Sequence, residues 1–131
     1  MTASEVTEKF ARLESQIAQE KGDFTLFALF MREDAPDRWD LIVAAPWVGD
    51  DKQGAVNYLV DQIKSRLGEE TLTSLARIVP IDSGHVAVQN LNRAIHTEHG
   101  SVEVRDSTFF GLPIKQAYFI TSKRPPAAAA T

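Results

Sequence analysis

The sequence predicts an α+β domain: a single mainly antiparallel sheet of about five strands packed with three helices, in the order α-β-β-α-(α)-β-α-β-β. Three observations indicate this class. Residues 3–21 carry apolar side chains at helical spacing, a short polar link joins two apolar runs at 24–31 and 39–46, and two strand-like segments, 101–111 and 112–122, follow near the end. Strands paired through short links favour antiparallel neighbours, because parallel neighbours need a longer crossover.

The first helix is predicted by an apolar stripe at steps of four, three and four residues: Val6, Phe10, Leu13 and Ile17. Thr2 and Glu5 have the spacing of a capping box, and Gly22 is a typical helix stop. The sequence therefore predicts both ends of this helix.

The two apolar runs predict a pair of central strands. "FTLFALFM" at 24–31 and "WDLIVAAP" at 39–46 are apolar on both alternating faces, which is typical of strands covered on both sides. Three helices supply little cover for so apolar a sheet, so we expect a homodimer to bury the remainder.

The other elements follow from turn residues and apolar spacing. Asp50 or Asp51 is expected to cap a second helix that Gly68 closes, and a short helical piece leads into a strand at 77–81. Ser83 is expected to cap a third helix that runs to Gly100, and the strands 101–111 and 112–122 follow. Residues 1–122 form one domain in this interpretation, and the Pro/Ala-rich segment 123–131 is a disordered tail.

Composition excludes several classes of protein. The 131 residues include no cysteine, which excludes disulfides and thiolate zinc sites and fits a cytoplasmic location. The net charge is −4 and the basic residues are scattered, which argues against a nucleic-acid partner. The first twenty residues lack the uninterrupted apolar core of a signal peptide or a membrane span.

The polar link between the first two strands holds four carboxylates within eight residues: Glu33, Asp34, Asp37 and Asp40. Such a cluster suits general acid–base chemistry or a hard cation such as Mg²⁺. The competing interpretation, which we prefer, is a solvated hairpin tip whose acids are neutralised by Arg32 and Arg38.

The helix–strand–strand–helix opening over about residues 3–67, with its acidic second strand, is similar in outline to the nucleotidyltransferase superfamily. The resemblance implies metal-binding carboxylates on the second strand. That family has a Gly-Ser first turn and an Asp-x-Asp pair, whereas this chain has "MRED" and the pair Arg38 and Asp40. We therefore assign no membership.

The string "AIHTEHG" offers His96, Glu98 and His99 near the expected end of the third helix. A metal could use them, but zinc needs at least a third protein ligand, and histidine near a helix C-terminus is also favoured by the helix dipole alone. We prefer the second interpretation.

Aromatic residues gather in two places. Trp47 follows the second strand, and Phe109, Phe110 and Tyr118 lie close to Lys115 in the last two strands. These rings belong either to the core, which is their commoner place, or to a ligand pocket or partner surface in which Arg105 and Lys115 would contact an anion.

We expect a non-catalytic module that dimerises and binds a protein partner or a small ligand through the Trp47 loop and the aromatic C-terminal strands, with no cofactor. The sequence has no "GxxxxGK[ST]", "GxGxxG" or "GxSxG" motif, which favours this hypothesis over catalysis. The alternative is a metal-assisted hydrolase or a nucleotidyl- or phosphoryl-transfer enzyme that uses the acidic loop 33–40, with Arg38 or Lys115 stabilising anionic charge.

Overall fold

A computed structural model describes residues 2–124 and confirms the α+β class. The ten elements follow in the order α1 (Ala3–Lys21), β1 (Leu26–Arg32), β2 (Trp39–Ala44), α2 (Pro46–Asp50), α3 (Lys52–Leu67), α4 (Glu69–Thr73), β3 (Leu75–Ile81), α5 (Val86–Ala94), β4 (Val102–Phe109) and β5 (Leu112–Ser122). No helix among the described residues is both long and apolar enough to cross a membrane.

The five strands form one sheet in the order β3-β2-β1-β5-β4. The pairs β1–β2, β1–β5 and β4–β5 are antiparallel, as expected. The pair β2–β3 is parallel, because α2, α3 and α4 carry the chain back between those strands. The sheet is therefore mixed, and the two most apolar strands lie next to each other inside it.

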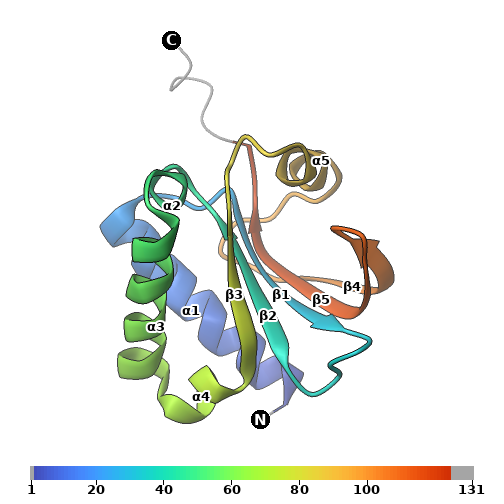
Figure 1. The fold of residues 1–131 in the computed structure, drawn as a ribbon, viewed down its shortest axis with the longest axis horizontal. Coiled ribbons are helices and arrows are strands. Elements are labelled where there is room, and N and C mark those ends of the chain that lie inside the picture. The colour runs from blue at the N-terminus through green and yellow to red at the C-terminus, as the bar shows by residue number, and fades with distance from the viewer. Residues whose placement is uncertain (1, 125–131) are drawn as a thin grey trace.

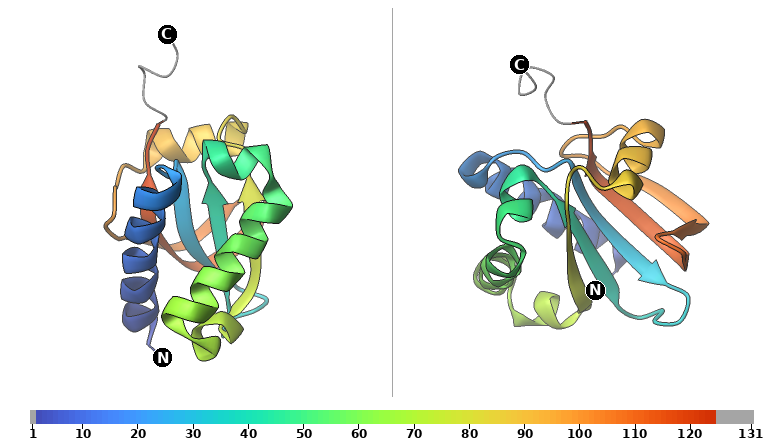
Figure 2. Two further views of the ribbon diagram at one scale, coloured as in Figure 1. Left: turned by 90° about the vertical axis from the view of Figure 1, so that its left-hand side faces the viewer. Right: turned by 45° about the horizontal axis from the view of Figure 1, so that its top comes forward.

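Helices α1 and α3 lie side by side on one face of the sheet, which we call the first face (Figures 1 and 2). The second face is covered by α5 near one end and by the curved β4–β5 hairpin (Figure 1). Each face has its own cluster of buried apolar side chains, with Phe10, Phe27 and Leu59 in the first cluster and Phe30, Val88 and Phe119 in the second. The two-sided apolarity of β1 and β2 is thus explained by two cores.

The predicted caps of α1 are present. Thr2 Oγ1 accepts a hydrogen bond of 3.1 Å from the backbone N–H of Glu5, and Gly22 ends the helix with φ 109°. Asp51 caps α3 through the N–H of Gly54. Local signals of this kind placed the long helices correctly.

Three expectations need correction. Residues 2–124 hold five helices rather than three: Pro46 begins the unexpected short helix α2 directly after β2, and α4 is the short helical piece expected before β3. His85 caps α5, while the Ser83 hydroxyl lies 2.9 Å from that of Thr25. Helix α5 ends at Ala94, so the segment up to Gly100 is a loop.

Within the expected tail, Lys123 and Arg124 are described, and the remainder lies outside the described residues.

Candidate functional site

The charged link between β1 and β2 is built around one buried carboxylate. Asp40 is 2% exposed, and its Oδ2 accepts hydrogen bonds from Arg32 Nε at 2.9 Å and from Arg77 Nε at 3.0 Å. Arg32 also pairs with exposed Asp34 at 3.1 Å. The carboxylate of Asp40 is thus held between two guanidinium groups that connect β1, β2 and β3.

The other features of this link fit a hairpin tip. Glu33 and Asp37 are exposed, as expected of such a tip. Arg38 donates to the backbone carbonyls of Thr73 and Leu75, so of the two arginines expected to neutralise the acids, Arg32 does so and Arg38 does not. A metal site in this loop stays a prediction, and the pairing of Asp40 with two arginines counts against it.

Trp47 lines a pocket of about 460 Å³ at the end of the first face. Its walls come from the turn after α1, the start of α2 and the end of β5, with apolar parts from Phe24 and Pro46 and charged parts from Lys21, Asp23, Asp50, Lys123 and Arg124. The volume lies in the range of small-ligand pockets. Binding of a small anionic ligand here stays a prediction.

Phe109 and Phe110 lie on the second face, around the buried ring of Phe30. The ring centroids lie 5.1 Å from Phe30 for Phe109 and 6.0 Å for Phe110. Beside them is a hollow of about 130 Å³, which we call the aromatic hollow. It is lined by Phe30, Asp40, Ile42, Arg77, Val79, Ile81, Phe109, Phe110, Leu112 and Ile114.

The backbone at Phe110 is unusual for a bulky residue. Phe110 and Gly111 form the two-residue turn between β4 and β5, with φ 54° and 75°. Turns of this kind favour Asn or Gly, and the left-handed conformation costs most other residues about 1–2 kcal/mol. Phe110 occupies this position while its side chain is 37% exposed. An aromatic ring is therefore presented at the hairpin tip against local conformational preference.

The remaining residues of the predicted site lie apart from the hollow. Tyr118 packs on Trp39 in the first cluster, and its hydroxyl donates to Glu103 at 3.3 Å. Arg105 also binds Glu103, at 2.6 Å, and this hydrogen bond raises the pKa of Arg105. Lys115 is exposed. The structure therefore divides the predicted site between the two faces of the sheet.

The structure also contains a buried polar cluster that the sequence analysis missed. Glu14, on the inward face of α1, is fully buried, and its Oε1 lies 2.5 Å from His99 Nδ1. The Thr121 hydroxyl donates to Glu14 Oε2 at 2.8 Å and accepts the backbone N–H of His99 at 3.1 Å. One signal was available, because Glu14 stands in helical register between Phe10 and Ile17 on the apolar stripe.

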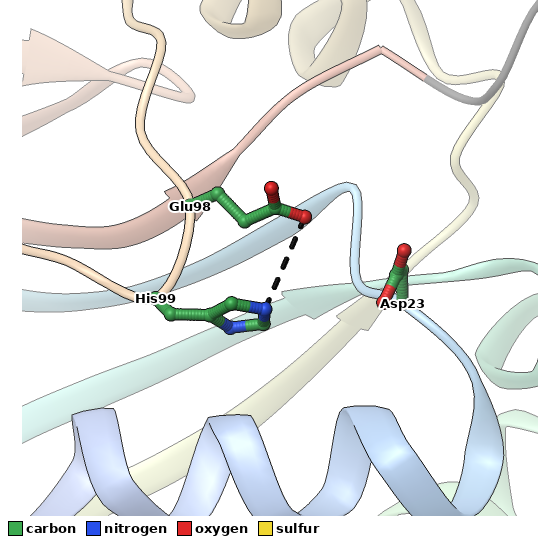
Figure 3. A group of neighbouring side chains, drawn as sticks. All are labelled: Asp23, Glu98 and His99. Atoms are coloured by element: carbon green, nitrogen blue, oxygen red, sulfur yellow. Dashed lines mark ion pairs between the residues drawn. The ribbon is translucent and has the colours of Figure 1, made fainter.

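Of the histidines considered together, only His99 joins this cluster. His96 Nε2 lies 3.1 Å from the carbonyl oxygen of Arg93. Among residues 2–124, Asp23, Glu98 and His99 form the one group of three potential metal ligands whose ligand atoms all lie within 4.8 Å of one another. Figure 3 shows Glu98 and His99, from the loop before β4, facing Asp23 in the turn after α1.

Comparison with known proteins gives no match: no family model, no curated protein and no solved structure is significantly similar to this chain. We therefore infer function from the geometry of the chain itself.

Proposed function

We propose that the protein is a non-catalytic binding module that associates with a second copy of itself through the aromatic hollow. The observation that carries the proposal is Phe110, a bulky aromatic residue kept partly exposed in a left-handed turn beside an apolar depression. Backbone strain that persists at an exposed position is a pointer to function rather than to folding.

The size of the hollow supports a side chain as its occupant. An apolar cavity of about 150 Å³ takes one benzene molecule, and the aromatic hollow measures about 130 Å³. One aromatic or branched side chain therefore fills it. Phe110 itself is such a side chain and stands at the rim of the hollow. The same surface therefore carries both a projecting side chain, Phe110, which we call the knob, and the hollow that can receive one.

Symmetry makes this combination self-complementary. In a twofold dimer the same patch is used by both subunits, so Phe110 of each copy can enter the hollow of the other. Leu112, 36% exposed next to the turn, adds apolar surface beside the knob. The half-buried side chains of Val79 and Ile81 on β3 form the opposite wall.

The proposal includes a cytoplasmic location, which the cysteine-free sequence supports.

Sedimentation equilibrium at micromolar concentrations tests the proposal. The wild-type protein is expected at twice the chain mass of 14.5 kDa, and Phe110→Asn is expected at the mass of one chain. Asparagine tolerates the left-handed backbone, so this change removes the ring and leaves the turn favourable. Circular dichroism and cooperative thermal unfolding verify that the variant is folded.

Val86→Ser is the matched control, because Val86 is 64% exposed on α5 and does not line the hollow. This variant should associate like the wild type. A monomeric wild-type protein across the concentration range, or a Phe110→Asn variant that remains dimeric, would overturn the proposal.

A further inference from the structure

We propose that Asp23, Glu98 and His99 bind a divalent transition-metal ion, best matched by Zn²⁺, and that Glu14 is the positioning residue for His99. None of these residues lines the aromatic hollow, so the proposal is independent of self-association. It assigns a role to the one fully buried carboxylate of α1 and to the histidine that this carboxylate contacts.

The imidazole of His99 is fixed from behind by a closed ring of hydrogen bonds. Glu14 Oε1 contacts Nδ1, the hydroxyl of Thr121 donates to Glu14 Oε2, and the same hydroxyl accepts the backbone N–H of His99. A carboxylate that holds one ring nitrogen of a histidine is the usual partner of a metal-binding imidazole, because it sets the tautomer and the direction of the other nitrogen. In the tautomer that this contact favours, Nδ1 donates to the Glu14 carboxylate and Nε2 is left available.

The backbone helps to set this orientation. His99 has φ 53°, in the left-handed region that few residues other than glycine adopt. Its N–H is held by Thr121, and its side chain is 38% exposed although Glu14 behind it is fully buried. The loop therefore presents one edge of the ring outward and anchors the other edge in the core.

Nε2 faces carboxylates. Glu98 Oε2 lies 3.9 Å from His99 Nε2, and Asp23 approaches from the turn after α1 (Figure 3). Lys123 marks the point at which the two acids converge, because its ammonium group hydrogen-bonds to Glu98 Oε2 and lies 3.0 Å from Asp23 Oδ2. The two carboxylates therefore already converge on one cationic group, which is the arrangement that a shared metal ion requires.

The donor set selects the ion. One imidazole nitrogen and two carboxylate oxygens suit Zn²⁺, which binds such atoms at about 2.0–2.2 Å and so places tetrahedral ligands about 3.4 Å apart. The three ligand atoms now lie within 4.8 Å of one another, and the side chains of Asp23 and Glu98 are 52% and 49% exposed. Side-chain rotations that move the two carboxylates by about 1 Å bring the three ligand atoms to the spacing of a tetrahedral zinc site. Mg²⁺ prefers oxygen ligands alone and should bind more weakly.

Lys123 then competes with the metal ion for the carboxylates of Asp23 and Glu98. Its ammonium group must leave the two carboxylates when the ion binds, and its long flexible side chain allows this movement. Removal of the ammonium group should therefore tighten metal binding. If the cluster were only a set of ion pairs, the same change would produce no metal binding.

The experiment is calorimetric titration of the full chain with ZnCl2, together with thermal unfolding in ZnCl2 or MgCl2. Zinc at about 100 times its dissociation constant is expected to raise the melting temperature by at least 5 °C, and magnesium to raise it less. Lys123→Met should tighten zinc binding roughly tenfold, as expected when two competing exposed ion pairs are removed.

Two variants test the ligands, and one serves as the control. Asp23→Asn and His99→Gln should each weaken zinc binding at least tenfold, and Asp23→Asn does so without touching the buried ring of hydrogen bonds. His96→Gln, which changes a nearby exposed histidine outside the cluster, should bind zinc like the wild type. The proposal is wrong if zinc binds neither the wild type nor Lys123→Met, or if it binds Asp23→Asn unchanged.

The positioning role of Glu14 has its own readout. Imidazole ¹⁵N chemical shifts should show the proton on Nδ1 of His99 before zinc is added, and a zinc-dependent shift at Nε2. In Glu14→Gln the preference for the Nδ1 proton should weaken, because a neutral amide oxygen is a poorer acceptor than a carboxylate, and zinc binding should weaken about tenfold. An unchanged tautomer with unchanged zinc affinity would remove Glu14 from the proposal.

Discussion

Asp40 and Glu14 are two buried carboxylates with different surroundings. Asp40 meets two guanidinium groups that are charged at every ordinary pH, and so it serves as a fixed connector between strands. Glu14 meets a neutral hydroxyl and an imidazole, whose second nitrogen remains available at the surface. A buried carboxylate must be paired, but the partner determines whether the pair only stabilises the fold or also supports a site.

Replacement of Asp40 by Asn is expected to lower the free energy of unfolding by about 2 kcal/mol, because both arginines lose a charged partner but can still reach water. Asp37→Asn is the control at an exposed position of the same link and should change this free energy by less than about 0.5 kcal/mol. Urea denaturation of the three proteins measures the difference. Equal stability of wild type and Asp40→Asn would contradict the connector role.

The β4–β5 hairpin shows how one turn decides an element. Gly111 has φ 75°, and a Cβ added to it would meet nothing within 4 Å. Gly111→Ala is therefore expected to lower the free energy of unfolding by about 1 kcal/mol through backbone strain alone. Gly84→Ala, with equal space and no positive φ, should be neutral or slightly stabilising. Denaturant midpoints compare the two, and equal effects would reject the explanation.

The elements that the sequence predicted are those whose signals are local. Helix α1, the pair β1–β2 and the β4–β5 hairpin depend on caps, alternation and turns within a few residues. Helix α2 was missed because Pro46 directly follows a strand, where it reads equally well as the strand's end. The cap of α5 was assigned to Ser83, whose hydroxyl instead lies within hydrogen-bond distance of Thr25, 58 positions away.

The candidate sites depend on contacts that no local pattern encodes. Glu14 and His99 are separated by 85 positions, and only the packing of α1 on the sheet brings them together. Conversely, the sequence analysis assigned Trp47 and Phe110 to one binding role, although the sheet places them on opposite faces. The parallel pairing of β2 with β3 could not be predicted from local sequence patterns either, because it depends on where α3 packs.

At the scale of the whole molecule, α1 and α3 are joined across the first face by a polar cluster around Glu20. The Tyr58 hydroxyl donates to Glu20 Oε2 at 3.0 Å, and Arg66 Nη2 lies 3.1 Å from Oε1. Lys21 lies 4.8 Å from the centroid of the Tyr58 ring. This layer supports the Trp47 pocket at its end, whereas the second face carries the aromatic hollow, so the sheet separates the two surfaces.

The Glu20 cluster makes stability depend on pH in the alkaline range. Partial burial, followed by the hydrogen bond to Glu20 and the charge of Glu20, raises the pKa of Tyr58 above its ordinary value of 10.0. The unfolded chain therefore loses this proton first, and the stabilisation, complete below pH 10, is lost as pH rises through the higher folded-state pKa. The pKa of Tyr118 is raised in the same direction by burial and by Glu103.

We expect the wild-type protein to exceed Tyr58→Phe in free energy of unfolding by a constant margin below pH 10, and this margin to shrink above it. Tyr118→Phe should show the same trend, and the double variant should lose both contributions. Because all four proteins carry the same lysines, the differences between them report the tyrosines and not lysine titration. Denaturant unfolding between about pH 8 and 11, with ultraviolet absorbance of tyrosinate recorded on the same samples, measures the effect. Parallel pH profiles for all four proteins would show that neither hydroxyl is linked to folding.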